Sequence, residues 1–316
     1  MTEYEFFRLL CDQELNLINK LDKKLRQGFI ESLINKGLSI QNNNDCIINI
    51  EQLRYYDKTS YYDKQILLTN FKSKLNDIEL HVLYETDSTN KAIKKINNDK
   101  INILLAEYQL SGQGRRGKQW LSPIGSNIYL SIKFKAQYTA KTSLYPLYIA
   151  TIIAEFFSQS GIEKVAVKWP NDIYIDNKKS VGILLESIAQ GTSQSIVLGI
   201  GINIFADPRL TSQIDQPITS LFEHTNNNEL LNKNLLLSKL LPKLFTANEN
   251  FSFIDNQFVI HAFEQYNWLK NKKISIIENE NIYQGDFIRI NNDGSLVALI
   301  NNTEKNFYAA EVSVKC

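Results

Sequence analysis

The first 62 residues combine a helical pattern with a short β-prone one. Apolar side chains recur at helical spacing over residues 17–34, and Gly37 follows where a helix C-cap is expected. Two apolar runs, 38–40 and 46–50, flank a polar tip and predict a hairpin. Helices followed by a hairpin are the plan of a winged helix, which we therefore expect at residues 1–62. The polar, tyrosine-rich stretch 55–62 is its predicted linker.

From residue 64 onward, strand-like and helix-like patterns alternate. Many predicted strands follow one another through short turns, which favours a mixed α+β sheet over a doubly wound one. We expect this α+β domain to occupy residues 63–270 and a small β-barrel, built from short strands, to occupy 271–316. In the α+β domain, strands are predicted at 78–84, 101–108, 127–134, 165–168, 173–175, 181–187 and 195–204, and helices at 90–96, 144–161, 230–245 and 255–266.

Composition excludes several classes of protein. The chain has 316 residues, 43% of them apolar, and a net charge of +1, which is ordinary for a folded protein of about two domains. Its three cysteines form no CxxC pair, and its three histidines are isolated, so a zinc ribbon, a disulfide framework or a histidine-rich metal site has no support. The first residues lack a signal peptide's apolar core, and the longest apolar run, 144–157, contains Glu155. We expect a cytoplasmic protein without a membrane partner.

A glycine-rich segment, Gly112-Gln113-Gly114-Arg115-Arg116-Gly117, matches the literal pattern GxGxxG. The dinucleotide fingerprint needs a helix that starts within the motif and an acid that binds the ribose. Here Pro123 and Gly125 follow, and no acid occurs over residues 118–151, so we exclude a nicotinamide enzyme. What remains is a mobile loop with two arginines, which suit a carboxylate or a phosphate. A plain solvated loop is the alternative.

Two further stretches carry chemistry. Lys168-Trp169-Pro170-Asn171-Asp172 and, after it, Lys179 place lysines at strand ends, where they suit a phosphate or an activated carboxylate. Asn171 and Asp172 offer oxygens for Mg²⁺ or a base, although an ordinary turn and a hairpin tip would explain the same residues. Asp87-Ser88-Thr89-Asn90 precedes a predicted helix as an N-cap cluster whose hydroxyls can also bind a polar ligand.

Together these stretches resemble the biotin–protein ligase family across roughly residues 80–205. The resemblance also rests on Ala106-Glu107-Tyr108-Gln109, Gly182-Ile183-Leu184-Leu185-Glu186 and Gly199-Ile200-Gly201-Ile202-Asn203. It implies a class II synthetase-like catalytic domain with a mixed sheet, followed by an SH3-like C-terminal barrel. The N-terminal segment is similar to the winged helix of the family's bifunctional ligase/biotin operon repressor members, and about one short helix smaller.

The resemblance implies two half-reactions. Biotin and ATP, with Mg²⁺, give biotinyl-5′-AMP, and a lysine of the biotin carboxyl carrier protein of acetyl-CoA carboxylase then takes the biotinyl group. The implied catalytic residues are Arg115, Lys179 and Asp172, and Asn171 is the implied Mg²⁺ ligand. The implied biotin-binding residues are Ser88, Thr89, Asn90, Gln109, Gln113, Gly114, Arg115, Lys179 and Gly182. The implied ATP-binding residues are Arg115, Arg116, Trp120, Lys168, Asn171, Lys179 and Asn203.

The chain departs from the family at two positions. Gln113 stands where the family more often has arginine, and Pro217 stands about where some members place an aromatic under the adenine. The adenine contact is therefore unassigned.

Three alternatives stay open. Residues 1–62 carry eight basic and nine acidic residues, a net charge of −1, whereas a DNA-binding module normally shows a basic footprint. The chain is thus either a ligase that also binds operator DNA or a monofunctional ligase, and a homodimer is one of its two open oligomeric states. A lipoate ligase is the third, less favoured alternative.

Overall fold

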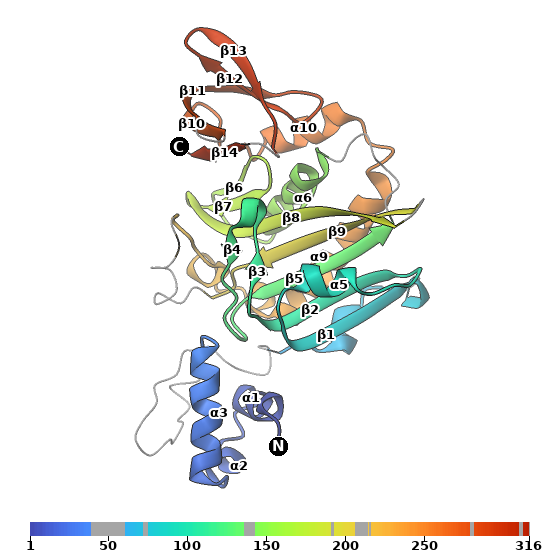
Figure 1. The fold of residues 1–316 in the computed structure, drawn as a ribbon, viewed down its shortest axis with the longest axis vertical. Helices are drawn as coiled ribbons and strands as arrows, with labels where there is room; N and C mark the ends of the chain where they lie inside the picture. The colour runs from blue at the N-terminus through green and yellow to red at the C-terminus, as the bar shows by residue number, and fades with distance from the viewer. Residues whose placement is uncertain are drawn as a thin grey trace. The chain divides into compact units, whose positions relative to one another are not determined.

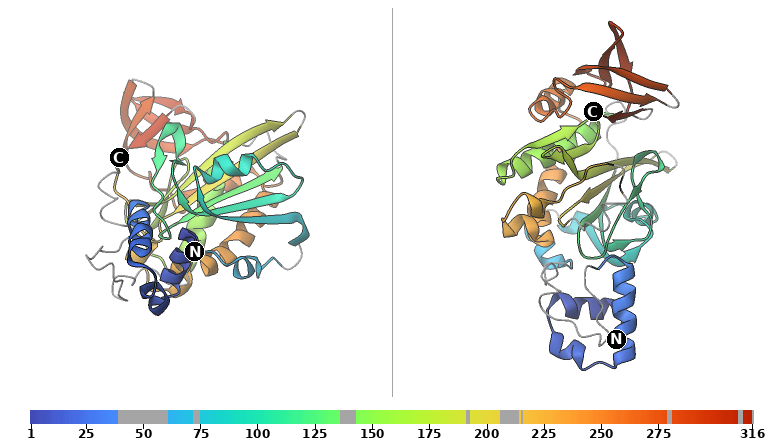
Figure 2. Two further views of the ribbon diagram at one scale, coloured as in Figure 1. Left: turned by 60° about the horizontal axis from the view of Figure 1, so that its bottom comes forward. Right: turned by 90° about the vertical axis from the view of Figure 1, so that its left-hand side faces the viewer.

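The computed structural model describes residues 1–38, 61–71, 75–135, 143–190, 193–205, 214, 216–278, 281–309 and 312–315. The chain divides into two compact units. One is formed by Met1–Lys135 with Leu184–Lys239, and the other by Ala136–Ile183 with Leu240–Cys316. Figures 1 and 2 show the elements along the chain. Within the described part of the chain, no helix is both long enough and apolar enough to cross a bilayer.

Three helices open the first unit: α1 (Glu3–Cys11), α2 (Leu15–Asn19) and α3 (Lys23–Asn35). The helical run predicted over 17–34 is two helices, because the Asp22 backbone leaves helical geometry (φ −51°, ψ 134°) and its side chain caps the start of α3. α1 lies before that run and is additional to it.

Gly37 ends α3 and confirms the predicted C-cap. Its φ of 90° is the left-handed region that favours glycine, and Leu38 N–H donates to the Leu33 carbonyl at 2.9 Å. Of the predicted hairpin over 38–50, only Leu38 is described, and of the predicted linker only residues 61 and 62 are.

A seven-stranded mixed sheet has the strand order β1-β2-β5-β9-β8-β7-β6. Its strands are β1 (Ile78–Thr86), β2 (Ile101–Gln109), β5 (Ile128–Lys135), β6 (Val165–Lys168), β7 (Asp172–Ile175), β8 (Lys178–Gln190) and β9 (Ser193–Ile202). β1 and β2 are parallel, whereas β2–β5, β5–β9, β6–β7 and β7–β8 are antiparallel. This pairing confirms the predicted α+β class.

Short elements of the first unit surround its strands. α5 (Thr89–Lys94) packs on β2, β5 and β9, and its position brings residues 88–90 against the sheet. The hairpin of β3 (Gly112–Gln113) and β4 (Gln119–Trp120) encloses the turn η3 (Arg115–Gly117). The other elements are α4 (Lys64–Leu68), η2 (Leu75–Asp77), η4 (Leu221–Glu223) and α8 (Asn228–Leu231).

The helix predicted over 230–245 is wrong in its bounds, because Asn232 interrupts it. Asn232 has an extended backbone, and its side chain accepts the backbone N–H groups of Asn234 and Leu235. It therefore separates α8 from a new helix, α9 (Lys233–Asn250), which continues past Pro242.

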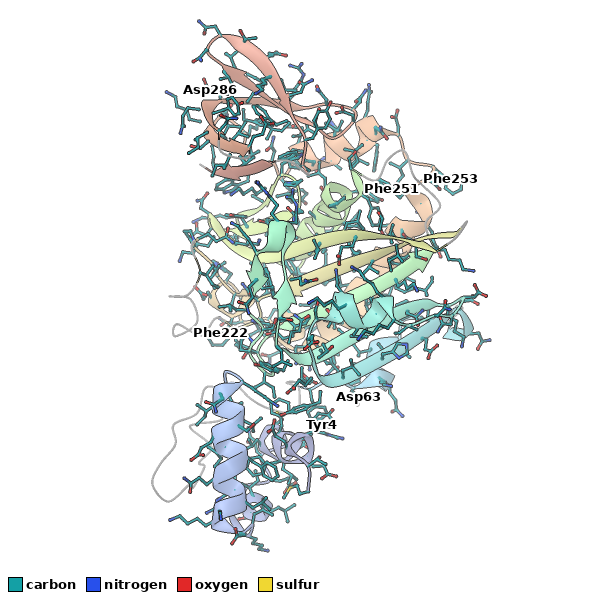
Figure 3. The ribbon with its side chains drawn as sticks, viewed as in Figure 1. Tyr4, Asp63, Phe222, Phe251, Phe253 and Asp286 are labelled. Carbon is teal, nitrogen blue, oxygen red and sulfur yellow. The ribbon has the colours of Figure 1, made fainter. Side chains whose placement is uncertain are left out.

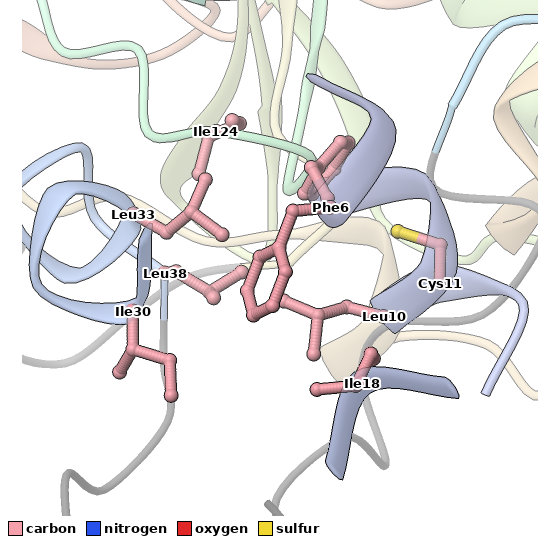
Figure 4. Packing of buried hydrophobic residues seen from close by; sticks show 9 residues of the cluster. Phe6, Leu10, Cys11, Ile18, Ile30, Leu33, Leu38 and Ile124 are labelled. Carbon is pink, nitrogen blue, oxygen red and sulfur yellow. The ribbon is translucent and has the colours of Figure 1, made fainter. Parts of the chain in front are cut away.

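The N-terminal helices share a core with the loop between β4 and β5. Phe6, Leu10 and Leu33 are fully buried, and Ile124 from that loop packs among them (Figure 4). Ile124 N–H also donates to the Lys36 carbonyl at 2.9 Å. The helices are thus fixed to the segment that follows the glycine-rich loop.

A buried ion pair lies in the same unit. Lys233 Nζ, at the start of α9, is 2.8 Å from the Glu107 carboxylate on β2, and both side chains are at most 2% exposed. Glu107 also accepts from Tyr62 N–H at 2.9 Å, and the Lys233 ammonium lies over the Tyr62 ring. Burial raises the pKa of the Glu107 carboxyl, and Lys233 opposes that rise.

The second unit contains α6 (Tyr145–Gln159), which packs on β6, β7 and α10 (Asn256–Glu264). Gly161, at φ 91°, follows α6 as predicted. The C-terminal segment forms a five-stranded antiparallel sheet in the order β13-β12-β11-β10-β14, which bears out the predicted small β domain. Its strands are β10 (Lys273–Glu278), β11 (Asn281–Ile290), β12 (Leu296–Ile300), β13 (Thr303–Phe307) and β14 (Val312–Lys315).

Candidate functional site

A cluster of buried polar side chains surrounds the N-terminus of α5. Ser88, Thr89 and Asn90 are at most 4% exposed. Gln109, at the end of β2, accepts the Thr89 backbone N–H at 2.8 Å and donates from Nε2 to Ser122 Oγ at 2.8 Å. The strand end and the helix start therefore bring these predicted residues together, and Ser122 joins them.

Asn90 links this cluster to β8. Its Nδ2 donates to Glu186 at 2.7 Å, and Lys94 Nζ lies 2.6 Å from the other Glu186 oxygen. On β9, a Cβ added to Gly199 would lie 2.4 Å from Asn90 Oδ1, so the amide rests directly on the strand backbone. Only glycine permits that approach.

The glycine-rich loop has an open, turned geometry. Arg116 has φ 55° and Gly117 φ 72°, both in the left-handed region, and Gly114 N–H donates to the Lys118 carbonyl at 2.7 Å. β4 follows the turn, so the motif is not followed by the helix that a dinucleotide fingerprint requires. Arg115 is half-buried, whereas Gln113 and Arg116 are exposed.

This loop encloses a cavity of about 570 Å³ together with side chains of α5 and β8. Its lining carries the cations Lys91, Arg115, Arg116 and Lys118 and the carboxylate of Glu186. A lining with four cations and one carboxylate suits an anionic ligand. The full lining is Lys91, residues 111–119, Leu184 and Glu186.

Trp120 packs against β9 at Gly201. A Cβ added to Gly201 would be 2.3 Å from Trp120 Cε2, so the indole ring packs against the glycine backbone. The strand therefore carries two glycines, Gly199 and Gly201, that each accept a side chain from elsewhere in the unit.

Asn203, just after β9, is buried, and its Nδ2 donates to the Thr219 carbonyl at 3.2 Å. Backbone hydrogen bonds tie the η4 turn to the same segment, since Leu221 N–H donates to Asn203 at 2.9 Å. Phe222, labelled in Figure 3, is 46% exposed, and its ring centroid lies 5.3 Å from that of Phe205. An aromatic pair therefore adjoins Asn203.

The second unit holds the remaining predicted residues. Lys179 Nζ is 2.8 Å from Asp172 Oδ1, with the two side chains 13% and 19% exposed. Asn171 Nδ2 donates to the Ile183 carbonyl, and Asp172 pairs with Gly182 in the β7–β8 register. The start of β7 and the neighbouring strand β8 thus bring the Lys179 cation to the Asp172 carboxylate, directly after Asn171.

Lys168 lies in an aromatic setting within that unit. Its Nζ is 3.3 Å from Tyr174 Oη and 5.0 Å from the centroid of the Trp268 ring. Trp169 is buried and donates from Nε1 to the Gly294 carbonyl in the β11–β12 turn at 2.9 Å. The second unit's C-terminal sheet therefore anchors the segment that carries Lys168 and Asn171.

Sequence reasoning assigned no role to Glu186, Ser131 or Trp268. A carboxylate within the apolar strand 181–188 is one signal for Glu186, and the alternation of Gly199 and Gly201 within a strand signals that other groups approach closely. Ser131 on β5 carries no such signal, because only the fold brings it beside Asn90. No cluster of three or more His, Cys, Asp or Glu side chains that could hold a metal occurs among the described residues.

Comparison with known proteins identifies the family. Residues 82–203 match the Biotin/lipoate A/B protein ligase family. The chain is 31% identical over 257 residues to the bifunctional ligase/repressor BirA of Escherichia coli, covering 79% of each chain. It is 32% identical over 135 residues to the biotin–[acetyl-CoA-carboxylase] ligase of Paracoccus denitrificans, covering 40% of this chain and 55% of the relative.

The fold agrees with that assignment. The biotin protein ligase of Aquifex aeolicus, solved in complex with biotin and ATP, superposes with a TM-score of 0.64 at 23% identity. The alignment covers 75% of this chain and 98% of that structure. At that identity the likeness establishes the fold, while the longer match to the Escherichia coli protein establishes the kinship. The chain belongs to the biotin–protein ligase family.

Proposed function

We propose that this chain is a biotin–[acetyl-CoA-carboxylase] ligase. The biotin carboxylate attacks the α-phosphate of ATP, forming biotinyl-5′-AMP and releasing pyrophosphate. The ε-amine of a carrier-protein lysine then attacks the mixed anhydride, and AMP leaves. The observation that carries the proposal is the polar cluster and cationic cavity built from residues 88–131 and 184–186, all of them within the family match. We retain 1–62, 63–270 and 271–316 as the domain bounds and the cytoplasm as the location.

In this proposal the polar cluster binds the biotin head. Ser88, Thr89, Asn90 and Gln109 present buried hydroxyl and amide groups that match the donors and acceptor of a cyclic urea. A site built to hydrogen-bond such a head rejects an acid that lacks one, because its own polar groups would then be left unpaired. Lipoate has no ureido group, so the cluster favours biotin over the lipoate alternative.

The glycine-rich loop binds the biotin carboxylate and the α-phosphate of ATP. Gln113 offers a side-chain donor to the biotin tail, Gly114 lets the loop backbone approach that tail closely, and Arg115 and Arg116 neutralise charge near the α-phosphate. Trp120, packed on Gly201, follows this loop and helps to exclude water from the mixed anhydride. Asn203 holds the nucleotide side of the site.

The predicted residues of the second unit keep the roles that the family resemblance implies. Lys179 is the cation for the reacting carboxylate, Asp172 accepts the proton of the incoming lysine, and Gly182 gives room for the biotin tail. Lys168 binds the phosphates. We assign Mg²⁺ to Asn171 because an amide oxygen is a hard ligand of the kind Mg²⁺ takes, together with phosphates and water. When bound, Mg²⁺ would neutralise phosphate charge.

The first half-reaction tests the ligase proposal without an acceptor. Purified chain with MgATP should release pyrophosphate when biotin is added, and far less when lipoate is added at the same concentration. Pyrophosphate release with lipoate but not biotin would assign the chain to the lipoate branch of the family, and release with neither acid would refute the proposal.

DNA binding is the second candidate function, favoured by α1–α3 and by the name of the Escherichia coli relative. Lys20, Lys23 and Lys24 are exposed around the start of α3 and can contact phosphates of operator DNA, bound by a homodimer. The alternative is a monofunctional ligase. Binding to the promoter of a biotin-synthesis operon that weakens steeply with salt would support repression, whereas salt-independent or absent binding would support the alternative.

A further inference from the structure

A segment of the second unit, residues 266–268, is bonded through its backbone to the outer edge of β6. Val167 N–H donates to the Tyr266 carbonyl at 2.6 Å, and Trp268 N–H donates to the Val167 carbonyl at 3.0 Å. Lys168 is the next residue along β6. These two hydrogen bonds therefore fix the backbone of Trp268 beside that of Lys168.

Two contacts orient the indole ring of Trp268. Its Nε1 donates to Asn177 Oδ1, in the turn between β7 and β8, at 3.0 Å. Its ring centroid lies 4.8 Å from that of Tyr174, a β7 residue that is only 4% exposed, with the two planes inclined by 37°. Because the N–H is hydrogen-bonded and the ring packs on a buried neighbour, the indole presents a fixed surface to the residues around it.

The Lys168 ammonium lies against both aromatic rings. Its Nζ is 5.0 Å from the Trp268 centroid and 5.2 Å from the Tyr174 centroid, and it donates to the Tyr174 hydroxyl at 3.3 Å. Both ring distances are within the range of about 6 Å over which an aromatic face attracts a cation. An aromatic ring carries no net charge, so the two rings restrict where the ammonium lies and do not neutralise it.

We propose that Trp268 is a positioning residue for ATP binding, which acts by holding the Lys168 ammonium where it meets the nucleotide phosphates. The inference rests on the proposed function, in which Lys168 binds those phosphates. A lysine side chain has many rotamers, and restricting it before the ligand arrives reduces the entropy that binding must remove. Loss of the ring's attraction should therefore weaken the use of ATP and leave that of biotin unchanged, because Lys168 is assigned to the phosphates alone.

The first test weakens the ring's attraction while keeping its shape. Mono-, di- and trifluorotryptophan are placed at position 268 alone by nonsense suppression, since each fluorine withdraws electron density from the face that attracts a cation. KM values for ATP and for biotin are measured from biotin-dependent pyrophosphate release. We expect the KM for ATP to rise with each fluorine, by about three- to tenfold over the series, while the KM for biotin and the urea midpoint stay constant. A KM for ATP that is constant across the series would overturn the positioning role.

Substitutions at position 268 separate the ring from its hydrogen bond. Trp268→Phe retains a ring but loses the N–H that donates to Asn177, whereas Trp268→Leu loses the ring, so only the leucine variant should raise the KM for ATP. In a Lys168→Met background, Trp268→Leu should add no further rise, because the ammonium that the ring holds is already gone. An equal rise with and without Lys168 would show that Trp268 acts only on the fold, and would overturn the proposal.

Lys272→Met is the matched control. The Lys272 ammonium lies 3.4 Å from the centroid of the same ring, so this variant removes a cation from the segment and keeps the contact between Trp268 and Lys168. It should leave the KM for ATP at the parent value. A rise as large as that in Trp268→Leu would assign the effect to the overall charge of the segment and would also overturn the proposal.

The outcomes for the parent chain separate this inference from the proposed function. A parent chain that releases no pyrophosphate from biotin and ATP would refute the proposed function, and the inference with it. Normal release by the parent, with a KM for ATP that is unchanged or lower in Trp268→Leu, would refute the positioning role of Trp268 alone.

Discussion

The buried pair of Glu107 and Lys233 gives a quantitative prediction for the change Lys233→Met. Methionine keeps most of the side-chain volume but removes the cation 2.8 Å from a carboxylate that is fully buried. Breaking a buried pair by removing one partner destabilises a fold by about 3–5 kcal/mol. At roughly 2–4 °C per kcal/mol for a unit of this size, the melting temperature should fall by about 6–20 °C.

The pH dependence has a definite sign. Burial already raises the pKa of Glu107 in the folded chain, and loss of Lys233 removes the main influence that opposes the rise. The folded state of the variant then binds more protons than the unfolded state between the two pKa values. That contribution is present in full below the unfolded pKa and is lost as pH rises through the folded pKa. The variant's deficit in unfolding free energy should therefore grow from about pH 5 to about pH 8.

Thermal and urea unfolding, followed by circular dichroism at both pH values, measure this effect. The matched control is the double variant Glu107→Gln, Lys233→Met, which has no buried charge at this site and should recover much of the lost stability. A Lys233→Met deficit within about 0.5 kcal/mol of zero at pH 8, or a deficit that shrinks as pH rises, would refute the reasoning.

Three further predictions concern catalysis. Lys179→Ala should reduce biotin-dependent pyrophosphate release by about 10²–10³-fold with circular dichroism unchanged; near-normal release would remove Lys179 from the catalytic residues. Arg115→Gly should still form the adenylate but release it faster and biotinylate bystander proteins, which mass spectrometry detects; parent-like behaviour would place Arg115 outside the site. In Gly201→Ala the added Cβ would lie 2.3 Å from the Trp120 ring, which must move by roughly 1 Å to restore contact. Adenylate should then dissociate faster than from the parent. An unchanged off-rate would show that the packing of Trp120 on Gly201 is not needed to retain the adenylate.

The pattern of apolar residues and turn residues predicted most strands of the sheet, because each strand has its own apolar run bounded by turns. β2 and β5 are nearly continuous apolar runs buried over most of their length, and the turns before β8 and β12 carry residues that tolerate positive φ. The helix predicted over 230–245 failed at Asn232, because the spacing of leucines continues through a residue whose side chain caps the next helix. Asparagine is frequent in this chain, so its presence alone did not mark that break.

The functional site, like the fold, was predicted from the sequence only in part. Motifs placed Thr89, Gln109 and Lys179 in the sequence, and the structure gives the first two a shared hydrogen-bond network and the third a carboxylate partner. The sequence could not predict which side chains pair with Asn90 and Glu107. Glu186 lies 96 positions from Asn90, and Lys233 lies 126 positions from Glu107. Such pairs exist only once the strands and helices that carry them have packed, and no local pattern encodes them.

The most direct test of the central claim is complete turnover with an acceptor. The chain is incubated with biotin, MgATP and the apo form of a biotin carboxyl carrier domain, and the carrier is analysed by intact mass and peptide mapping. The account predicts a gain of one biotinyl group on a single lysine, dependent on both biotin and ATP and absent with lipoate. A carrier that gains no mass, or gains it without ATP, would contradict the assignment.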